Sequence, residues 1–397
     1  MENHTLKTDY AGKRGALFKL AIKTSLLTVL TLGIYRFWMK TRLRRFYWSA
    51  IRPGGIPLEY TGTGVEKLMG FLIAVVFLSF YIGIVNLLLV FVSFSLINSN
   101  LAAYALSFVG LIPIYFYAQY RARRYVLART RWRTMRFGIE AAAWPYAWRA
   151  MLHWLATILT LGLLLPRQIF WLEKFRIDRT WFGDQKFTQE GRWTQLLPIA
   201  IHMYIGIGLT IAATAGLWIS PASASLFLLS VPWLFFGFVH FQIQSFRFLA
   251  RQKRLGANIR FVAEPRTWRV IRIYIFGGLL IWLSVLAVLV GLGLIVGLVV
   301  SRVGPEVFSS QNLQGMFADG TASKPLVVAA SIIAYFAFFI FSGVLVQIFI
   351  TMPKLAHYAR TLRVLNTAEL ALIRQRPRDE MSSAEGFAEA LDIGAAI

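Results

Sequence analysis

The chain contains no cysteine and few acidic residues. Of its 397 residues, 18 are Asp or Glu against 42 Lys or Arg, and the formal net charge is +24. Without cysteine, the protein has no disulfide, no cysteine-ligated zinc and no thiol nucleophile. Only 15% of the residues are charged, whereas 57% are hydrophobic and the mean hydropathy is positive. This composition is typical of an integral membrane protein.

Two long stretches lack charged side chains altogether. No Asp, Glu, Lys or Arg occurs from Leu68 to Tyr120 or from Trp193 to Phe246. A membrane-spanning helix needs roughly 20 apolar residues, so each stretch is long enough for two helices and a turn. Two further apolar runs follow later in the chain. The sequence therefore predicts about six transmembrane helices, at residues 68–97, 101–120, 196–219, 224–246, 273–300 and 326–350.

A short phrase occurs twice. Residues 28–33 read TVLTLG and residues 157–162 read TILTLG, and the match continues into the basic residues that follow. A weaker match relates Pro353–Val364 to Pro166–Ile177. Internal repetition of this kind organises a whole fold. We therefore predict a first repeat unit at 1–145, a second at 146–270, a degraded third with two helices at 271–375, and a polar acidic tail at 376–397.

Charge predicts the topology. Basic arms occur at 36–67, 121–149, 167–192, 247–272 and 353–375. Short loops rich in Lys and Arg stay in the cytoplasm, and some arms would lie outside if both phrase segments crossed the membrane. We therefore predict that these segments are two re-entrant or interfacial helices and that both termini are cytoplasmic. A model with eight spans and some basic arms outside is the alternative.

Several basic arms contain a glycine followed by alternating polar and apolar residues. Examples are Gly55–Tyr60, Gly183–Phe187 and Gly256–Phe261. Turn residues before such alternation favour short strands. One hypothesis is a small cytoplasmic β-layer built by the arms, and the alternative is a set of isolated extended loops. The fold class expected from the sequence is thus an all-α polytopic membrane protein, with the β-layer as an open hypothesis.

The candidate ligand-binding residues belong to two groups. The first group lies where the repeated helices break at glycine beside cations, since broken helix ends often face an anionic substrate in transporters. The second group is a pair of histidines in adjacent predicted spans, because ionisable residues at membrane depth are functional candidates. For the histidines, neutral hydrogen bonding between helices is the alternative. The candidates are Gly33, Arg36, Lys40, Gly162, Arg167, His202 and His240.

The sequence indicates no catalytic or metal site. None of the five histidines has metal-ligand spacing to another histidine or a carboxylate. A P-loop, a nucleophile elbow and a dinucleotide fingerprint are also missing. No carboxylate lies inside a predicted span, which disfavours a carrier that uses a buried Asp or Glu for proton coupling. We predict no cofactor, no metal and no enzymatic activity.

Four segments carry a resemblance to a known family. They are residues 31–40, residues 160–166, the arm at 247–261 and the tail segment at 385–394. With these segments the sequence resembles the YjgN family of bacterial inner-membrane proteins, although Arg167 stands where a small residue would be more usual. The resemblance implies a multi-pass protein of the bacterial inner membrane. It implies no activity, substrate or catalytic residue.

Two functions from different classes remain open. The doubled unit with glycine-broken helices favours a transporter or channel for an anionic solute or lipid. The alternative is a non-catalytic scaffold whose basic aromatic arms bind anionic lipid or a partner protein. The cations flank apolar spans and no nucleic-acid motif is present, so the predicted partners are anionic membrane lipids and not nucleic acid. The acidic tail is a candidate to dock on the arms. The oligomeric state is not indicated.

Overall fold

The computed structural model describes residues 5–96, 100–303, 336 and 338–376. The chain divides into two units, which are treated separately. The first contains Met1–Gly12, Phe37–Ile271 and Ala356–Ile397, and the second contains Lys13–Arg36 and Arg272–Leu355. The α-helices are α1 (Arg14–Leu30), α2 (Arg36–Ala50), α3 (Gly64–Phe80), α4 (Asn86–Leu96), α5 (Asn100–Ala128), α6 (Ala143–Leu159), α7 (Leu165–Ile177), α8 (Leu197–Gly216), α9 (Phe227–Arg251), α10 (Thr267–Val303) and α13 (Met352–Thr361).

Five helical segments among the described residues are long and apolar enough to cross a membrane. They are Gly64–Ser95, Trp193–Gly216, Pro221–Arg251, Thr267–Val288 and Phe338–Thr361. Short π-helical turns at Tyr81–Val85 and Gln347–Thr351 lie within the first and the last. These segments correspond to five of the six predicted spans. The other predicted span, 101–120, lies in α5, where the side chains of residues 101–109 are outside the described set.

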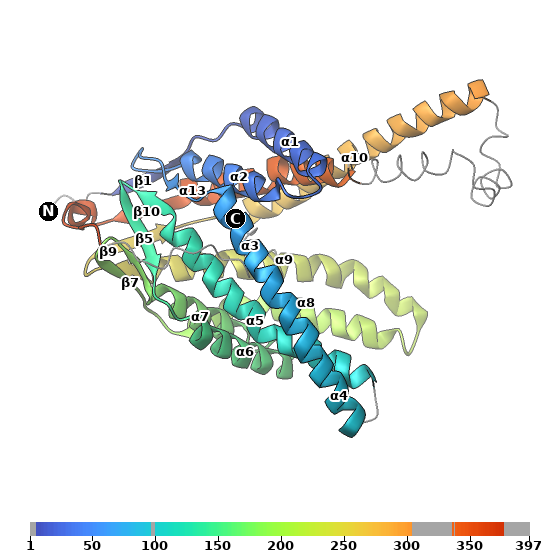
Figure 1. Cartoon of the computed structure of the whole chain (residues 1–397), viewed down its shortest axis with the longest axis horizontal. Coiled ribbons are helices and arrows are strands. Elements are labelled where there is room, and N and C mark those ends of the chain that lie inside the picture. The colour runs from blue at the N-terminus through green and yellow to red at the C-terminus, as the bar shows by residue number, and fades with distance from the viewer. Residues whose placement is uncertain (1–4, 97–99, 304–335, 337, 377–397) are drawn as a thin grey trace. The chain divides into compact units, whose positions relative to one another are not determined.

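One antiparallel sheet of ten strands belongs to the first unit. Its order is β2-β1-β10-β9-β8-β7-β6-β5-β4-β3. The strands are β1 (Leu6–Tyr10), β2 (Ile51–Pro53), β3 (Glu59–Tyr60), β4 (Thr130–Trp132), β5 (Met135–Ile139), β6 (Thr180–Phe182), β7 (Gln185–Gln189), β8 (Lys253–Leu255), β9 (Ile259–Ala263) and β10 (Leu362–Leu365). They gather at one end of helices α5, α7, α8 and α9 (Figure 1).

The all-α class predicted from the sequence is wrong. The arm segments expected to form a small β-layer do form strands β3, β7 and β9, but these strands belong to the ten-stranded sheet. Each strand has only two to five residues. Over so few residues, alternation is a weaker signal than the long helical runs on either side. The pairing also joins arms that lie far apart in the sequence.

The two ends of the strand order are joined by the chain itself. Strands β2 and β3 lie at opposite ends of the order, yet only residues 54–58 separate them in the sequence. The Leu58 amide donates a hydrogen bond to the Ile51 carbonyl at 3.0 Å. Gly54 and Gly55 have φ of 60° and 80°, a backbone conformation that glycine adopts without steric cost. This short connection therefore brings the last strand of the order back to the first.

One face of the sheet carries an apolar core. Trp132, Phe182, Leu255, Ile259 and Val364 are buried together there. Residues from the segment after β10 complete the same core, namely Leu370 and Ile373. Because side chains alternate along a strand, the residues between these positions point to the opposite face. We call the core side the inner face and the opposite side the outer face.

A common module repeats around the sheet. In the first unit, α5, α7 and α9 each lead into a strand hairpin, and the chain then enters another helical segment. In the β4–β5 hairpin, Arg133 and Thr134 both have positive φ, at 50° and 66°. Positive φ at both central residues defines the type I′ turn, whose twist suits a two-residue hairpin. Three of the five basic arms identified in the sequence, 121–149, 167–192 and 247–272, are thus the helix–hairpin junctions of this module.

The second unit contains α1, the larger part of α10 and the residues before α13. Gly277 on α10 lies against residues 349–350, and a Cβ placed there would meet the Phe349 carbonyl oxygen at 2.7 Å. Glycine at this position therefore permits a close approach of two helical segments. Close approach at glycine is a common way to pack helices in membranes.

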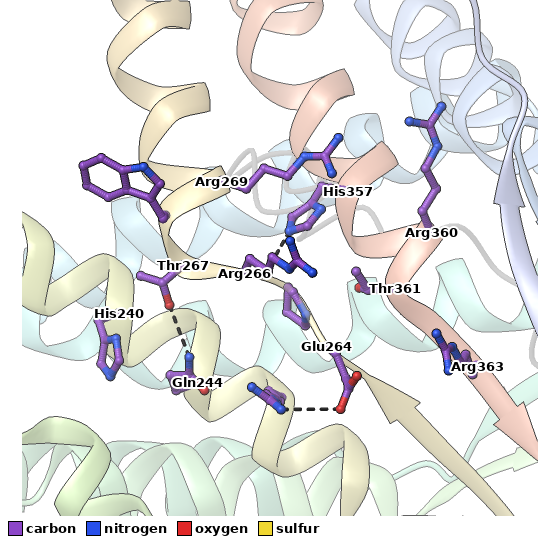
Figure 2. A pocket seen from close by; sticks show the side chains of 13 residues that line it. His240, Gln244, Glu264, Arg266, Thr267, Arg269, His357, Arg360, Thr361 and Arg363 are labelled. Atoms are coloured by element: carbon purple, nitrogen blue, oxygen red, sulfur yellow. Dashed lines mark hydrogen bonds and ion pairs between the residues drawn. The ribbon is translucent and has the colours of Figure 1, made fainter.

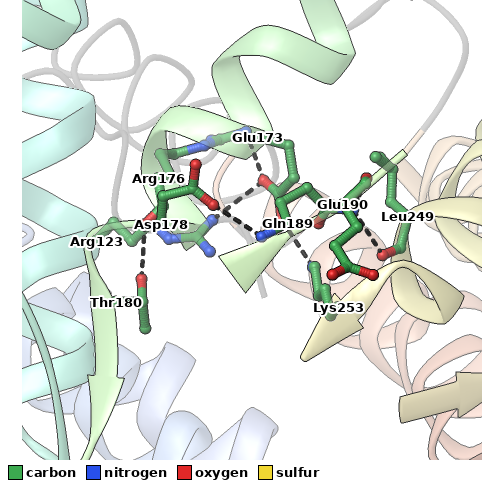
Figure 3. Close-up of polar contacts among 9 residues, drawn as sticks. All are labelled: Arg123, Glu173, Arg176, Asp178, Thr180, Gln189, Glu190, Leu249 and Lys253. Carbon is green, nitrogen blue, oxygen red and sulfur yellow. Dashed lines mark hydrogen bonds and ion pairs between the residues drawn. The ribbon is translucent and has the colours of Figure 1, made fainter. Parts of the chain in front are cut away.

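A buried charge cluster ties three elements of the first unit together (Figure 3). Glu173 on α7 is 14% exposed and contacts Lys253 Nζ of β8 at 2.9 Å. Its other partners are Arg176 Nη2 at 3.0 Å and Arg123 Nη1 of α5 at 3.7 Å. Desolvation by burial acts to raise the pKa of the Glu173 carboxyl, but the three cations together hold that pKa well below its usual range. The carboxylate is therefore charged and joins α5, α7 and β8.

Candidate functional site

A basic pocket lies within the first unit, between the end of α9, the start of α10 and the junction of α13 with β10 (Figure 2). Its volume is about 730 Å³. The lining contains five arginines, two histidines and one carboxylate. The charged and imidazole residues are His240, Arg247, Glu264, Arg266, Arg269, His357, Arg360 and Arg363. Such a lining attracts anions.

Most of the positive charge in the pocket is uncompensated. Glu264 Oε1 contacts Arg247 Nη2 at 3.4 Å and also accepts a hydrogen bond from Arg251. The bond from Arg251 lowers the pKa of the Glu264 carboxyl. In the described part of the chain, no hydrogen bond or ion pair is made by the guanidinium groups of the other four pocket arginines. They are Arg266, Arg269, Arg360 and Arg363.

Backbone and side-chain hydrogen bonds hold the pocket walls in place. The Arg266 amide donates to His357 Nε2 at 2.9 Å, which links the start of α10 to α13. Gln244 Nε2 donates to Thr267 Oγ1 at 3.2 Å, which links α9 to α10. Figure 2 shows both contacts beside the hollow. These contacts fix α9, α10 and α13 around the pocket without using the guanidinium groups of its arginines.

The two predicted histidines lie together at one side of this pocket. The rings of His202 on α8 and His240 on α9 are 5.3 Å apart, and His240 lines the pocket. His202 Nδ1 is buried and has no hydrogen-bond partner among the described residues. The α8–α9 pair is closely packed, because a Cβ at Gly237 would meet the His202 carbonyl oxygen at 2.5 Å. The histidines thus adjoin the basic pocket from the helix side.

The internal repeat provides a filled counterpart of this pocket. The two copies are aligned by the residues at which their elements begin, so that β5 is aligned with β9 and α6 with α10. In this alignment Ile139 corresponds to Ala263 and Tyr146 to Val270. Thr180 pairs with Ile139 in one copy, and Leu362 pairs with Ala263 in the other, so Thr180 corresponds to Leu362. Counting back five residues from each makes Phe175 the counterpart of His357. This register aligns α13 with α7 differently from the sequence match of Pro353–Val364 to Pro166–Ile177.

The counterpart groove is a packed aromatic core. Tyr120, Ile139, Tyr146 and Phe175 are buried in one cluster between α5, α6 and α7. The Tyr146 ring lies 5.2 Å from Tyr120 and 5.9 Å from Phe175. The residues that correspond to Ile139 and Tyr146 are the smaller Ala263 and Val270, which are buried next in sequence to the pocket residues Glu264 and Arg269. The region beside the basic pocket therefore carries less side-chain volume than its counterpart.

The repeated phrase forms the same turn in both copies. The Gly33 amide donates to the Thr28 carbonyl at 2.7 Å, and the Gly162 amide donates to the Thr157 carbonyl at 2.7 Å. A second bond, from Leu32 to Val29 in one copy, has its equivalent in the other. This pair of bonds defines the Schellman motif that ends a helix. The sequence repeat is therefore a repeat of conformation.

The turn places a leucine where glycine is usual. Leu32 and Leu161 both have φ of 50°, and their side chains are 95% and 78% exposed. A left-handed conformation costs an L-residue roughly 1–2 kcal/mol. Both copies of the turn therefore expose an apolar side chain in a strained conformation. The re-entrant or interfacial placement of these segments stays a prediction.

Replacing Gly162 with Ala is expected to destabilise the protein by about 1–2 kcal/mol, because φ is +90° there although the space around a Cβ is open. The measurement is thermal unfolding in detergent. Gly208 is the matched control, since it also has open space but lies within α8. Gly208→Ala should stabilise by about 0.5–1 kcal/mol. Equal effects of both substitutions would contradict the assigned turn.

The structure separates the predicted site residues into three places. Gly33 lies in the first turn, Arg36 begins α2 and Lys40 follows one helical turn later. Gly162 and Arg167 flank the start of α7. His202 and His240 are brought together, and His240 alone of the predicted residues lines the basic pocket. The pocket arginines were missed, although their two basic arms were recognised.

Among the described residues, no group of three or more metal-ligating side chains is present.

The described fold defines a class of protein: an integral membrane protein in which basic segments between apolar helices build one sheet. A family model described as a bacterial protein of unknown function, DUF898, matches residues 5–302. The chain belongs to this family. Inner membrane protein YjgN of Salmonella typhimurium is 33% identical over 82 residues, which are 20% of this chain and 21% of the relative.

The match therefore spans about a fifth of that relative's length. The resemblance to the YjgN family predicted from the sequence is confirmed. No solved structure matches the chain.

Proposed function

We propose that this protein binds the phosphate-bearing headgroup of an anionic membrane lipid in the basic pocket. The observation that supports this function is the set of four arginines without an ion pair in the described structure, around a hollow of about 730 Å³. Guanidinium groups bind phosphate oxygens through paired hydrogen bonds. The single carboxylate, Glu264, is already engaged by Arg247 and Arg251.

The position of the pocket along the chain favours a lipid over a free anion. Arg247 lies in the last turns of the candidate span Pro221–Arg251, and Arg269 lies in the first turn of Thr267–Val288. Arg360 lies in the last turn of Phe338–Thr361. Trp268 beside them is 63% exposed. Cations and aromatic rings at the ends of spans are placed at the level of lipid headgroups.

Neutralising two pocket arginines is expected to abolish retention of anionic lipid. In Arg269→Gln/Arg360→Gln, two charge-assisted contacts are lost, each worth roughly 1.5–3 kcal/mol, so affinity should fall by about 100-fold or more. The measurement is native mass spectrometry of the purified protein titrated with phosphatidylglycerol, glycerophosphate or inorganic phosphate.

The matched control is Arg52→Gln/Arg133→Gln, which removes the same charge at exposed positions outside the pocket. The control should retain lipid like the unmodified protein. Equal loss in both variants would show a general charge effect and overturn the proposal. Binding of inorganic phosphate as tight as that of the lipid would assign the pocket to a soluble anion instead.

Transport of the bound anion is the second candidate function. The observation that favours it is the identical turn at Gly33 and Gly162, since paired broken helices flank the binding sites of many transporters. Flux of phosphatidylglycerol across reconstituted vesicles, lower in the pocket variant and unchanged in its control, would support transport. Lipid binding without flux would leave the scaffold function.

We also propose a bacterial inner-membrane location with the sheet in the cytoplasm. The name of the Salmonella relative supports the membrane, although the match covers only part of that protein. The basic arms support the orientation, because the helix–hairpin junctions that build the sheet are the Lys- and Arg-rich segments of the chain. Both termini are placed on the same side in this proposal.

A further inference from the structure

The outer face of the sheet carries a band of cations, which we call the outer band. Its members are the residues that alternate with the core positions along each strand, and eight of the ten strands contribute one. In strand order they are Arg52, Lys7, Arg363, Arg260, Arg254, Lys186, Arg136 and Arg131. Strand β6 contributes Trp181 and β3 contributes Glu59 instead.

Like charges face each other across neighbouring strands of the outer band. Lys7 is directly opposite Arg363, and Arg254 is directly opposite Arg260. Like charges at directly opposed positions destabilise a sheet. Glu190 pairs with Arg254 at 3.0 Å and offsets part of this repulsion.

The compensation is incomplete at the middle of the sheet. Within the described chain, the side chains of Lys7, Arg260 and Arg363 make no ion pair. Lys186 of β7 pairs with Glu140 at 2.7 Å, and toward the ends of the strand order Asp9 is opposite Arg52 and Glu59 is opposite Arg131. Strands β1, β10 and β9 therefore present a cationic surface that calls for an anionic partner.

The C-terminal segment is anchored at this same face. The Arg374 carbonyl accepts a hydrogen bond from the Asp184 amide at 2.9 Å, and Gln375 Oε1 accepts one from the Arg136 amide at 3.0 Å. The Arg376 guanidinium lies 2.9 Å from the centre of the Trp181 ring. Gly138 on the adjacent strand leaves room for that ring, because a Cβ there would meet Trp181 Nε1. The last described residue, Arg376, therefore lies on the outer face beside β6.

The remaining residues match the outer band in charge and length. Residues 377–397 contain Asp379, Glu380, Glu385, Glu389 and Asp392 against one basic residue, Arg378. From β6 to β10 the band extends over four strand intervals, about 19 Å at the usual spacing. An extended segment of 21 residues reaches up to about 70 Å. The segment is therefore long enough to cover the band from its point of departure.

We propose that the acidic segment 377–397 lies on the outer band of its own chain, from β6 across β7 and β8 to the cations without an ion pair on β9 and β10. Its carboxylates offset the repulsion between the opposed cations. The inference is independent of lipid binding, because the outer band and the lipid pocket share only Arg363 among the residues named for them.

The absence of cysteine allows a direct test by engineered disulfides in the full-length protein. A disulfide requires Cα atoms roughly 4.4–6.8 Å apart, so its formation reports contact. Ser383→Cys is combined with Thr188→Cys on the outer face of β7, or with Thr361→Cys in the pocket. A third pair uses Ser220→Cys, before the turn that links α8 and α9. Mild oxidation is followed by peptide mass spectrometry.

The expected result is an intramolecular disulfide to position 188 in several-fold excess over positions 361 and 220. The excess should fall in 1 M NaCl, where the screening length is about 3 Å. It should also fall when Arg254→Glu and Arg260→Glu are introduced. A preference for position 361 would place the segment in the pocket and overturn the proposal. Intermolecular disulfides, or equal yields at all three positions, would overturn it as well.

Discussion

Replacing Glu173 with Gln is expected to lower the free energy of unfolding by about 3–5 kcal/mol, the usual cost of removing one member of a buried ion pair. The substitution leaves Arg123, Arg176 and Lys253 close together without the carboxylate that they share. Since these cations belong to α5, α7 and β8, their repulsion separates elements that the fold holds together. The measurement is thermal or chemical unfolding in detergent, followed by intrinsic fluorescence.

Glu190→Gln is the matched control for this result. Glu190 also pairs with an arginine, Arg254 at 3.0 Å, but its side chain is 42% exposed. Exposed ion pairs contribute about 1 kcal/mol or less. If both substitutions changed stability equally, the central role assigned to Glu173 would be wrong.

The pH dependence of the free energy of unfolding tests the same prediction in a second way. The folded-state pKa of Glu173 lies below its ordinary value, so its stabilising effect is fully present above the unfolded-state pKa. The effect is lost as the pH falls through the folded-state value, where protonated Glu resembles Gln. The stability difference between the unmodified protein and Glu173→Gln should therefore be constant near neutral pH and shrink in acid. A difference that grows in acid would contradict the assigned direction.

Replacing Val270 with Tyr is expected to remove lipid binding from the basic pocket. Val270 is buried and corresponds to Tyr146, which fills the counterpart groove between α5, α6 and α7. Val270 does not itself line the pocket, so a tyrosine ring in this position is expected to push the neighbouring wall at Arg269 into the hollow, without changing any charge. Native mass spectrometry should then show no bound phosphatidylglycerol at concentrations that saturate the unmodified protein.

The steric test separates volume from electrostatics. Val270→Thr, which has nearly the same size as valine, should retain lipid and serves as the control for substitution at this position. Thermal unfolding of both variants shows whether the protein still folds, since overpacking typically costs roughly 1–3 kcal/mol. A folded Val270→Tyr variant that binds lipid normally would show that the headgroup site lies elsewhere.

The membrane helices could be predicted because their signal is local. Long uncharged runs such as Leu68–Tyr120 indicate spans through composition alone, and five predicted spans correspond to apolar helices. The sheet was assigned only in part because its strands are short and its pairing is non-local. Strand β1 pairs with β10, for example, at Leu6 with Val364. No pattern within either segment indicates that partner.

Of the candidate site, the sequence indicated only the two histidines on one helix pair. His202 and His240 lie on neighbouring spans, and the structure brings them together. The pocket arginines belong to two arms that meet through the pairing of β9 with β10, where Leu362 lies opposite Ala263. Comparison of the repeat copies could have given a hint, since Tyr146 and its counterpart Val270 differ so much in size. Without the strand register, however, the size difference could not be assigned to a position in the fold.

The pairing of the first strand with the last also sets the order in which the protein matures. During synthesis from the N-terminus, β1 and β9 emerge with unpaired edges, and both stay open until Leu362–Leu365 leaves the ribosome. Open strand edges are templates for association with other chains. A nascent or truncated chain that ends before β10 is therefore recognisable as unfinished by those two edges. The final strand therefore completes the pairing of the whole sheet.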